Sequence, residues 1–225
     1  MPESFACARS RFARLGFVAV CAAAAALPPG LRADRQKPTP PLTSPAAFTE
    51  TAPDTYRAVL DTTVGFIVIR VQRDWAPHGA DRFYNLVKSG FYDECRFFRV
   101  VKDFVAQWGI HGDPAVAAAW ERATLPVDRA IMSNTRGRIT FAQGNLATSR
   151  ATQVFVNLKD NSRLDINSFA PIGEVVTSML IVDRIYHEYG EGIDQGAILT
   201  GGNALLAQAF PRLSYIKTAK IEPSH

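Results

Sequence analysis

The residues of this chain best suited to chemistry lie in the stretch RFFRVVKDFVAQWG, residues 96–109, which is mostly apolar yet holds Arg99 and Gln107. If the chain turns around residues 102–104, the flanking strands pair with Arg99 opposite Gln107. Side chains at facing positions of an antiparallel pair share one face. A guanidinium and an amide would then form a polar pair beside Phe104, suited to holding a polar group of a ligand. The alternative is a solvated strand arginine whose stem packs on its neighbours.

The elements that must position this pair are predicted to be short strands with two principal helices. Residues 56–72 alternate apolar and polar side chains around DTTVG, which is typical of a hairpin. Residues 76–92 show apolar side chains at helical spacing, with Gly90 as the stop signal of the helix. Further strands are predicted for 137–144, 152–158, 169–176 and 213–221. A second helix is predicted for 178–189, and a short helix or an ordered loop for 114–126. The remaining segments are predicted to be a loop, 190–196, and a helical turn, 203–210. These patterns predict a mainly β fold: a closed eight-stranded antiparallel β-barrel capped by two α-helices.

The N-terminal residues 1–33 are predicted to be an export signal peptide. Arg9, Arg11 and Arg14 precede the apolar run LGFVAVCAAAAAL, which has about the length of a signal h-region and is too short to span a bilayer comfortably. Residues 34–54, rich in proline and small polar residues, are predicted to be a linker, and residues 55–225 a single domain. We expect an exported protein, periplasmic or secreted, with an uncleaved membrane tether as the alternative.

Composition and motifs argue against several function classes. The 225 residues have a net charge of +4, but residues 1–33 hold four of the 25 basic and only one of the 21 acidic residues. The remainder therefore has a net charge of +1 and offers no electrostatic case for binding nucleic acid. The four histidines lack metal-ligand spacing, there is no calcium-loop pattern, and no serine stands in a nucleophile motif. Only Cys95 remains once the signal is removed, so no internal disulfide is expected.

Several segments resemble a known family in the same order. FFRVVKDFVAQWG, residues 97–109, closely resembles the signature of the cyclophilin-type peptidyl-prolyl cis-trans isomerases. NTRGRITFAQG, TQVFVNLKDNSRLD and FAPIGEVVTSMLIVDRI resemble later segments of that family, and residues 59–71 and 76–93 resemble its opening hairpin and first helix. The resemblance runs from about Tyr56 to the closing strand, with a C-terminal part similar to larger bacterial members. It implies catalysis of cis/trans exchange at X-Pro bonds.

The resemblance also implies roles for nine residues. Arg99 takes the position of the catalytic arginine, and Gln107 that of the glutamine that holds the arginine and the substrate. Phe104 takes the position of the residue at the floor of the proline pocket. The other implied substrate-binding residues are Val105, Ala142, Gln143, Phe155, Leu164 and Phe169, the last matched across a one-residue difference in length.

The implied reaction suits these residue types. Amide resonance opposes rotation about the peptide bond with a barrier of about 18–20 kcal/mol. No bond is made or broken, so no nucleophile, metal or cofactor is needed. In the twisted transition state the prolyl nitrogen regains a lone pair, which a fixed guanidinium can hydrogen-bond far better than in the planar ground state. The planar fork of an arginine can bond Gln107 at the same time.

Two positions depart from the family pattern. Trp108 stands where a glycine is usual, and it is expected either to narrow the site or to pack against AAAWERA, residues 117–123. Arg163 stands where many members carry the tryptophan that contacts cyclosporin, which implies weak sensitivity to that drug. We predict a monomeric isomerase that assists the folding of exported proline-containing polypeptides, with no nucleic acid or metal partner. The alternative is a non-catalytic proline-peptide-binding or chaperone module on the same fold.

Overall fold

A computed structural model describes residues 40–222, so the predicted signal peptide and the first part of the predicted linker lie outside the described residues. One antiparallel sheet of eight strands dominates it, and the predicted mainly β fold is confirmed. The strands are β1 Thr55–Thr62, β2 Gly65–Gln72, β3 Arg99–Val101, β4 Val105–Trp108, β5 Arg138–Phe141, β6 Val154–Asn157, β7 Pro171–Val175 and β8 Ile216–Ile221. The α-helices are α1 Pro77–Lys88, α2 Pro114–Glu121, α3 Met179–Val182 and α4 Gln195–Ala209.

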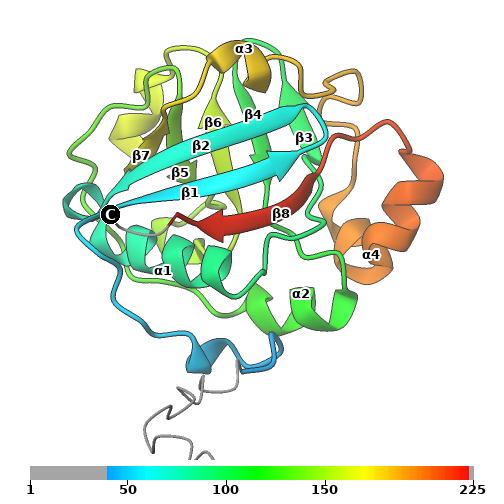
Figure 1. Cartoon of the computed structure of the whole chain (residues 1–225), viewed down its shortest axis with the longest axis horizontal. Helices are drawn as coiled ribbons and strands as arrows, with labels where there is room; N and C mark the ends of the chain where they lie inside the picture. The colour runs from blue at the N-terminus through cyan, green and yellow to red at the C-terminus, as the bar shows by residue number, and fades with distance from the viewer. Residues whose placement is uncertain (1–39, 223–225) are drawn as a thin grey trace, which may run out of the picture. The chain divides into compact units, whose positions relative to one another are not determined.

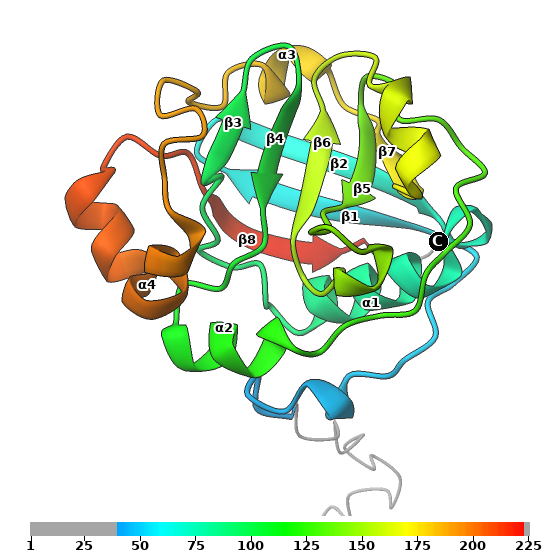
Figure 2. The ribbon, with the colours of Figure 1, turned by 180° about the vertical axis from the view of Figure 1, so that it is seen from behind.

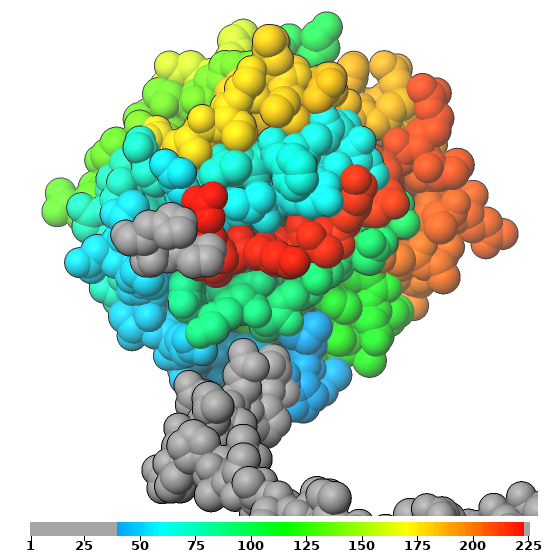
Figure 3. Space-filling view, in the orientation of Figure 1, coloured from blue at the N-terminus to red at the C-terminus, as the bar shows by residue number. Residues whose placement is uncertain are grey.

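The sheet curls around a single main core. Its strand order is β3-β4-β6-β5-β7-β2-β1-β8, and Figures 1 and 2, taken from opposite sides, show β1, β2 and β8 crossing one face of the other five strands. Side chains alternate between the core and the outside, as the pleat of a strand requires. In β1, for example, Tyr56, Ala58 and Leu60 are buried. Figure 3 shows the outer sides of β1, β2 and β8 at the molecular surface, with α1 beside them.

The predicted closure of the barrel is wrong, because β3 and β8 stand at the two ends of the strand order and share no ladder. The segments that precede them are joined by a single bridge, Arg96 opposite Tyr215. Farther along, the free edge of β3 is taken by a loop, since the Val100 amide donates to the Gly190 carbonyl at 3.2 Å. The sheet is therefore an open half-barrel. Residues 187–193, here called the β3 edge loop, occupy part of the edge that a closing strand would need.

In the part of the chain that the structure describes, four α-helices accompany the sheet, rather than the predicted two. The first predicted helix is confirmed as α1, and α2 begins where the Asp113 carboxylate accepts a hydrogen bond from the Ala115 amide at 2.8 Å. The helix predicted over 178–189 is reduced to the four residues of α3. After Asp183 the amides of Arg184 and Ile185 donate to carbonyls only three residues back, and the Tyr186 amide donates to the Ser214 hydroxyl at 3.1 Å, so the α-helical pattern does not continue.

Helix α4 is longer than the helical turn predicted over 203–210. The helix has a kink at Gly202, whose φ is 55°. A Cβ on Gly202 would lie 2.2 Å from the Gly112 carbonyl oxygen, so only glycine permits this close approach. The next amide, that of Asn203, donates to the same carbonyl at 2.9 Å. Because this contact stabilises the kinked backbone, the helix continues on both sides of the kink. Helix α4 packs beside α2 (Figure 1).

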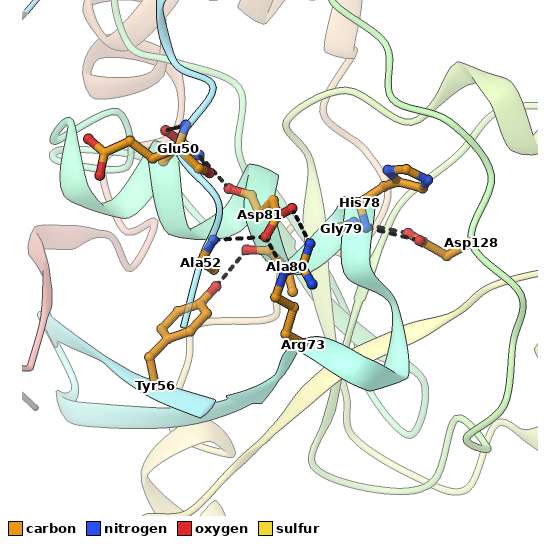
Figure 4. A network of polar contacts seen from close by, with 10 residues as sticks. Glu50, Ala52, Tyr56, Arg73, His78, Gly79, Ala80, Asp81 and Asp128 are labelled. Carbon is orange, nitrogen blue, oxygen red and sulfur yellow. Dashed lines mark hydrogen bonds and ion pairs between the residues drawn. The ribbon is translucent and has the colours of Figure 1, made fainter. Parts of the chain in front are cut away.

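Helix α1 begins without a side-chain cap of its own, because Ala76 stands at its N-cap position. The amides of His78 and Gly79 donate instead to the Asp128 carboxylate, at 3.0 and 2.9 Å (Figure 4). A carboxylate at this end also interacts favourably with the helix dipole. Asp128 in turn pairs with Arg150 at 3.3 Å, and both side chains are only 1% exposed. This buried pair ties the segment between α2 and β5 to the start of α1.

The part of the predicted linker that the structure describes is attached to the domain. Ala52 is buried, and its amide donates to Asp81 of α1 at 2.9 Å (Figure 4). Burial alone would raise the pKa of Asp81, but hydrogen bonds from Arg73 and from the Ala52 amide outweigh it and lower that pKa. Nearer the N-terminus, the Trp120 indole donates to the Leu42 carbonyl at 2.6 Å. No helix within residues 40–222 has the length and hydropathy needed to cross a membrane.

We predict that Asp128→Ala lowers the free energy of unfolding by roughly 3–5 kcal/mol, the usual effect of leaving one member of a buried ion pair alone. The substitution also leaves two helix amides without a partner. The matched control is Glu50→Ala, which removes the exposed pair with Lys88 and should change the free energy by less than about 1 kcal/mol. Urea denaturation of both variants measures the difference, and equal losses would contradict the assignment.

Candidate active site

A cavity of about 580 Å³ lies on the side of β3, β4 and β6 that is turned away from the core. The register predicted for the hairpin is confirmed, with Arg99 opposite Gln107. Gln107 is in turn opposite Phe155 of β6, so the three residues form a row across neighbouring strands. The pleat of β4 separates two environments: Val105 and Gln107 line the cavity, whereas the side chains between and after them enter the core.

A chain of hydrogen bonds fixes the polar groups of this row. Arg99 Nη1 donates to Gln107 Oε1 at 3.1 Å, and Gln107 Nε2 donates to Gln153 Oε1 at 2.7 Å. Gln107 is 6% exposed, so both ends of its amide are held in a nearly buried position. Gln153 was not among the predicted site residues, although it stands in the segment TQVFVNL that carried part of the resemblance. The chain orients one end of the Arg99 guanidinium toward the cavity.

Phe104 supplies an aromatic surface beneath two guanidinium groups. It follows the turn of the β3–β4 hairpin, and its carbonyl accepts hydrogen bonds from the Leu158 amide at 2.8 Å and from Asn161 Nδ2 at 2.9 Å. The centre of the Arg99 guanidinium lies 5.4 Å from the ring centroid, and that of Arg163 lies 4.8 Å from it. Cations over an aromatic face are attracted by its quadrupole. The hydrogen bonds fix the backbone of Phe104, and the two guanidinium groups lie close to its ring.

The remaining predicted residues complete the cavity wall. Phe155 is buried and meets Phe169 edge to face, with ring centroids 5.9 Å apart. Gln143 donates from Nε2 to the Asn167 carbonyl at 2.8 Å, while its Oε1 is buried and has no hydrogen-bond partner within residues 40–222. All nine residues that sequence comparison picked out line this one cavity: Arg99, Phe104, Val105, Gln107, Ala142, Gln143, Phe155, Leu164 and Phe169.

The far wall of the cavity comes from α2, α4 and the loop before α2, which the sequence did not connect with the site. Its lining residues there include His111, Ala117, Glu121, Gln195 and Leu199. The His111 ring packs 5.2 Å from that of Phe91, measured between centroids, and its Nδ1 accepts a hydrogen bond from the Asp113 amide at 2.9 Å. This acceptor role requires the neutral imidazole.

Trp108 does not narrow the site, so the first of its two predicted roles is wrong. It is 1% exposed and belongs to the main core. Its ring lies 5.3 Å from Phe97 and 6.4 Å from Tyr92, measured between centroids. Because it follows Gln107 directly on β4, it points to the opposite side of the strand. A large side chain at this position therefore fills the core and leaves the cavity open.

Within residues 40–222, no group of three or more histidine, cysteine, aspartate or glutamate side chains is placed to hold a metal ion. The site is instead an apolar cavity with a fixed guanidinium and neutral amides on its edge. Such a site can bind an apolar ring and present hydrogen-bond donors to a neutral polar group beside it.

Comparison with known proteins gives a consistent result. The family described as cyclophilin type peptidyl-prolyl cis-trans isomerase/CLD matches residues 58–197. A peptidyl-prolyl cis-trans isomerase of Acinetobacter baylyi is 31% identical over 134 residues, which are 56% of this chain and 69% of that protein. Peptidyl-prolyl cis-trans isomerase A of Dickeya dadantii is 30% identical over 140 residues, which are 60% of this chain and 73% of that protein.

Solved structures show the same fold. A cyclophilin type isomerase of Cryptosporidium parvum aligns with a TM-score of 0.54 at 14% sequence identity, covering 76% of this chain and 99% of that one. A structure of the same protein in the presence of the dipeptide Ala-Pro aligns with a TM-score of 0.53 at 14% identity, covering 75% and 99% of the two chains. At this level of identity the likeness concerns the fold.

The neutral state of His111 predicts a pH dependence of stability. Burial lowers the pKa of His111, with Asp113 and Asp93 partly offsetting the effect. As pH falls below about 6.5, the unfolded chain binds a proton at this histidine before the folded protein does, so the free energy of unfolding decreases. His111→Phe keeps an aromatic ring against Phe91 and should flatten this decrease. Urea denaturation at several pH values checks it; an unchanged slope for the variant would contradict the prediction.

Proposed function

The chain belongs to the cyclophilin-type peptidyl-prolyl cis-trans isomerase family, and from this premise we propose that Arg99 and the surrounding cavity catalyse rotation about X-Pro bonds in exported polypeptides. The observation that carries the proposal is the Arg99–Gln107–Gln153 hydrogen-bond chain at the edge of an apolar cavity. No metal or cofactor takes part, since the reaction makes and breaks no covalent bond.

The cavity suits a proline ring and the transition state of its rotation. Phe104, Phe155 and Phe169 give apolar surface of the kind that binds a pyrrolidine ring and excludes water from it. Arg99 then donates to the prolyl nitrogen, whose lone pair becomes available as the amide twists. This hydrogen bond is strong in the transition state and weak in the planar ground state, so it lowers the barrier. Exclusion of water strengthens it further.

The edge of β5 suits the backbone of the same peptide. Ala142 and Gln143 continue from β5 along the cavity, and the Ala142 amide is already used, donating to the Gln153 carbonyl at 2.9 Å. The buried Oε1 of Gln143 is an acceptor that a peptide N–H can satisfy, which relieves the usual penalty of a buried polar atom without a partner. We therefore expect the substrate to be an extended polypeptide segment that contains proline. We also propose that the protein acts as a monomer.

The N-terminal sequence supports a proposal about the compartment in which the protein acts. The arginines and apolar run of residues 1–33 support export, and we expect the enzyme outside the cytoplasm, in the periplasm or the medium. The N-terminal sequence of the protein isolated from that compartment should begin near residue 34. A chain that keeps Met1 and fractionates with membranes would favour the tethered alternative.

The catalytic proposal predicts that Arg99→Ala lowers the rate of isomerisation of a proline-containing peptide by roughly 10²–10³-fold, the usual effect of removing one transition-state donor. The free energy of unfolding should change little, because the guanidinium lies at the cavity edge. A protease-coupled or NMR exchange assay measures the rate.

Two controls sharpen this test. Arg129→Ala removes an exposed arginine that does not line the cavity, and it should keep the wild-type rate. Arg99→Lys keeps the charge but loses the planar fork, so it should restore only a small part of the rate. A wild-type protein that binds proline peptides without accelerating their exchange would establish the non-catalytic alternative.

A further inference from the structure

The catalytic guanidinium has a second partner that lies far from it in the sequence. Glu191 Oε1 accepts hydrogen bonds from both Nε and Nη2 of Arg99, the first at 2.9 Å. Glu191 belongs to the β3 edge loop, whereas Arg99 is the first residue of β3. The carboxylate therefore binds the Nε–Nη2 edge of the guanidinium, and Gln107 binds the guanidinium at Nη1.

The β3 edge loop is firmly attached on both sides of Glu191. Before it, the Gly190 carbonyl accepts the Val100 amide, and the Tyr189 ring packs 5.1 Å from that of Phe210. After it, Ile193 is buried in the smaller core cluster, which also contains Phe98, the residue next to Arg99. These contacts connect the loop with the same short stretch of strand that carries the guanidinium. The position of the carboxylate relative to Arg99 is thus set by packing as well as by charge.

The contacts leave donors free for the substrate. An arginine has five N–H donors. Glu191 takes one from Nε and one from Nη2, and Gln107 takes one from Nη1. One N–H therefore remains on each terminal nitrogen. The carboxylate occupies an edge of the guanidinium rather than its donor end, so it fixes the group without blocking it.

We infer that Glu191 is a positioning residue for the isomerase reaction, holding the plane of the Arg99 guanidinium in the orientation that the twisted X-Pro bond requires. The inference rests on the proposed function of Arg99. Glu191 acts only through Arg99 and need not touch the substrate. Because a long side chain held at one end alone samples other rotamers, loss of Glu191 should reduce the fraction of molecules with a correctly oriented donor.

The test compares the full chain in four forms: wild type, Glu191→Ala, Glu191→Gln and Glu188→Ala. Glutamine keeps an Oε1 that can accept both hydrogen bonds but removes the charge, so it separates orientation from electrostatics. Glu188 lies in the same loop, is 66% exposed and, within residues 40–222, forms an ion pair only with His187, at 3.4 Å. Its loss therefore removes equal charge without removing a contact of Arg99. Rates measured over a range of peptide concentrations give kcat and KM separately.

We expect Glu191→Ala to lower kcat about tenfold with KM changed less than about twofold, as displacement of an oriented catalytic group does. Glu191→Gln should stay within about threefold of the wild type, and Glu188→Ala should match it. In NMR spectra the Arg99 Nε–H should exchange slowly with water in the wild type and in Glu191→Gln, and rapidly in Glu191→Ala. This readout does not depend on activity.

A kcat for Glu191→Ala within about threefold of the wild type, or above it, would overturn the inference, and so would equal losses in the Ala and Gln variants. Arg99→Ala, assayed alongside, separates this failure from that of the proposed function. If Arg99→Ala loses its rate and Glu191→Ala does not, only the role of Glu191 is refuted. If Arg99→Ala keeps its rate, the catalytic proposal itself fails.

Discussion

The pairing register of β3, β4 and β6 is the constraint on which the site depends. Along β4, Val105 and Gln107 face the cavity and Ala106 and Trp108 face the core. A slip of one residue would exchange these faces, placing an indole in the cavity and an amide in the core. The packing of Trp108 against Phe97 therefore does more than fill space. It makes a one-residue slip costly and so helps to keep Gln107 opposite Arg99.

Distant segments of the chain complete what this register begins. Gln153 comes from the approach to β6, Glu191 from the β3 edge loop, and the far wall from α2 and α4. Residues 40–52, which precede β1, hold α1 and α2 through Asp81 and the Trp120 indole. An open half-barrel has room for this arrangement because the edge of β3 is free to bind a loop. A closing strand at the same place would exclude Glu191 from the site.

What the sequence could predict depended on how local the interaction was. Arg99 and Gln107 are joined by one tight turn, so their pairing followed from counting residues, and the family resemblance brought all nine predicted residues to one cavity. Closure was predicted wrongly because it depends on how β3 and β8, more than a hundred residues apart, meet at their edges. The length of α4 was underestimated because the contact between Gly202 and Gly112, which lets the helix continue through its kink, is tertiary. Glu191 lies in GEGIDQG, which suggested only a turn, and no spacing rule connects it with β3.

The kinds of partner around Arg99 follow the change in solvent exposure across the site. On the buried side the guanidinium meets Gln107, 6% exposed, and then Gln153, both neutral amides. A carboxylate there would lose its hydration, which is far costlier than burying a hydrogen-bonded amide. On the open side it meets Glu191, whose side chain is 62% exposed and keeps most of its hydration. An exposed ion pair of this kind adds little to folding stability and is screened by solvent. Glu191 can therefore orient the guanidinium while leaving most of the positive charge of Arg99 available inside the cavity. The prolyl lone pair develops there, and a low dielectric makes the charge most effective.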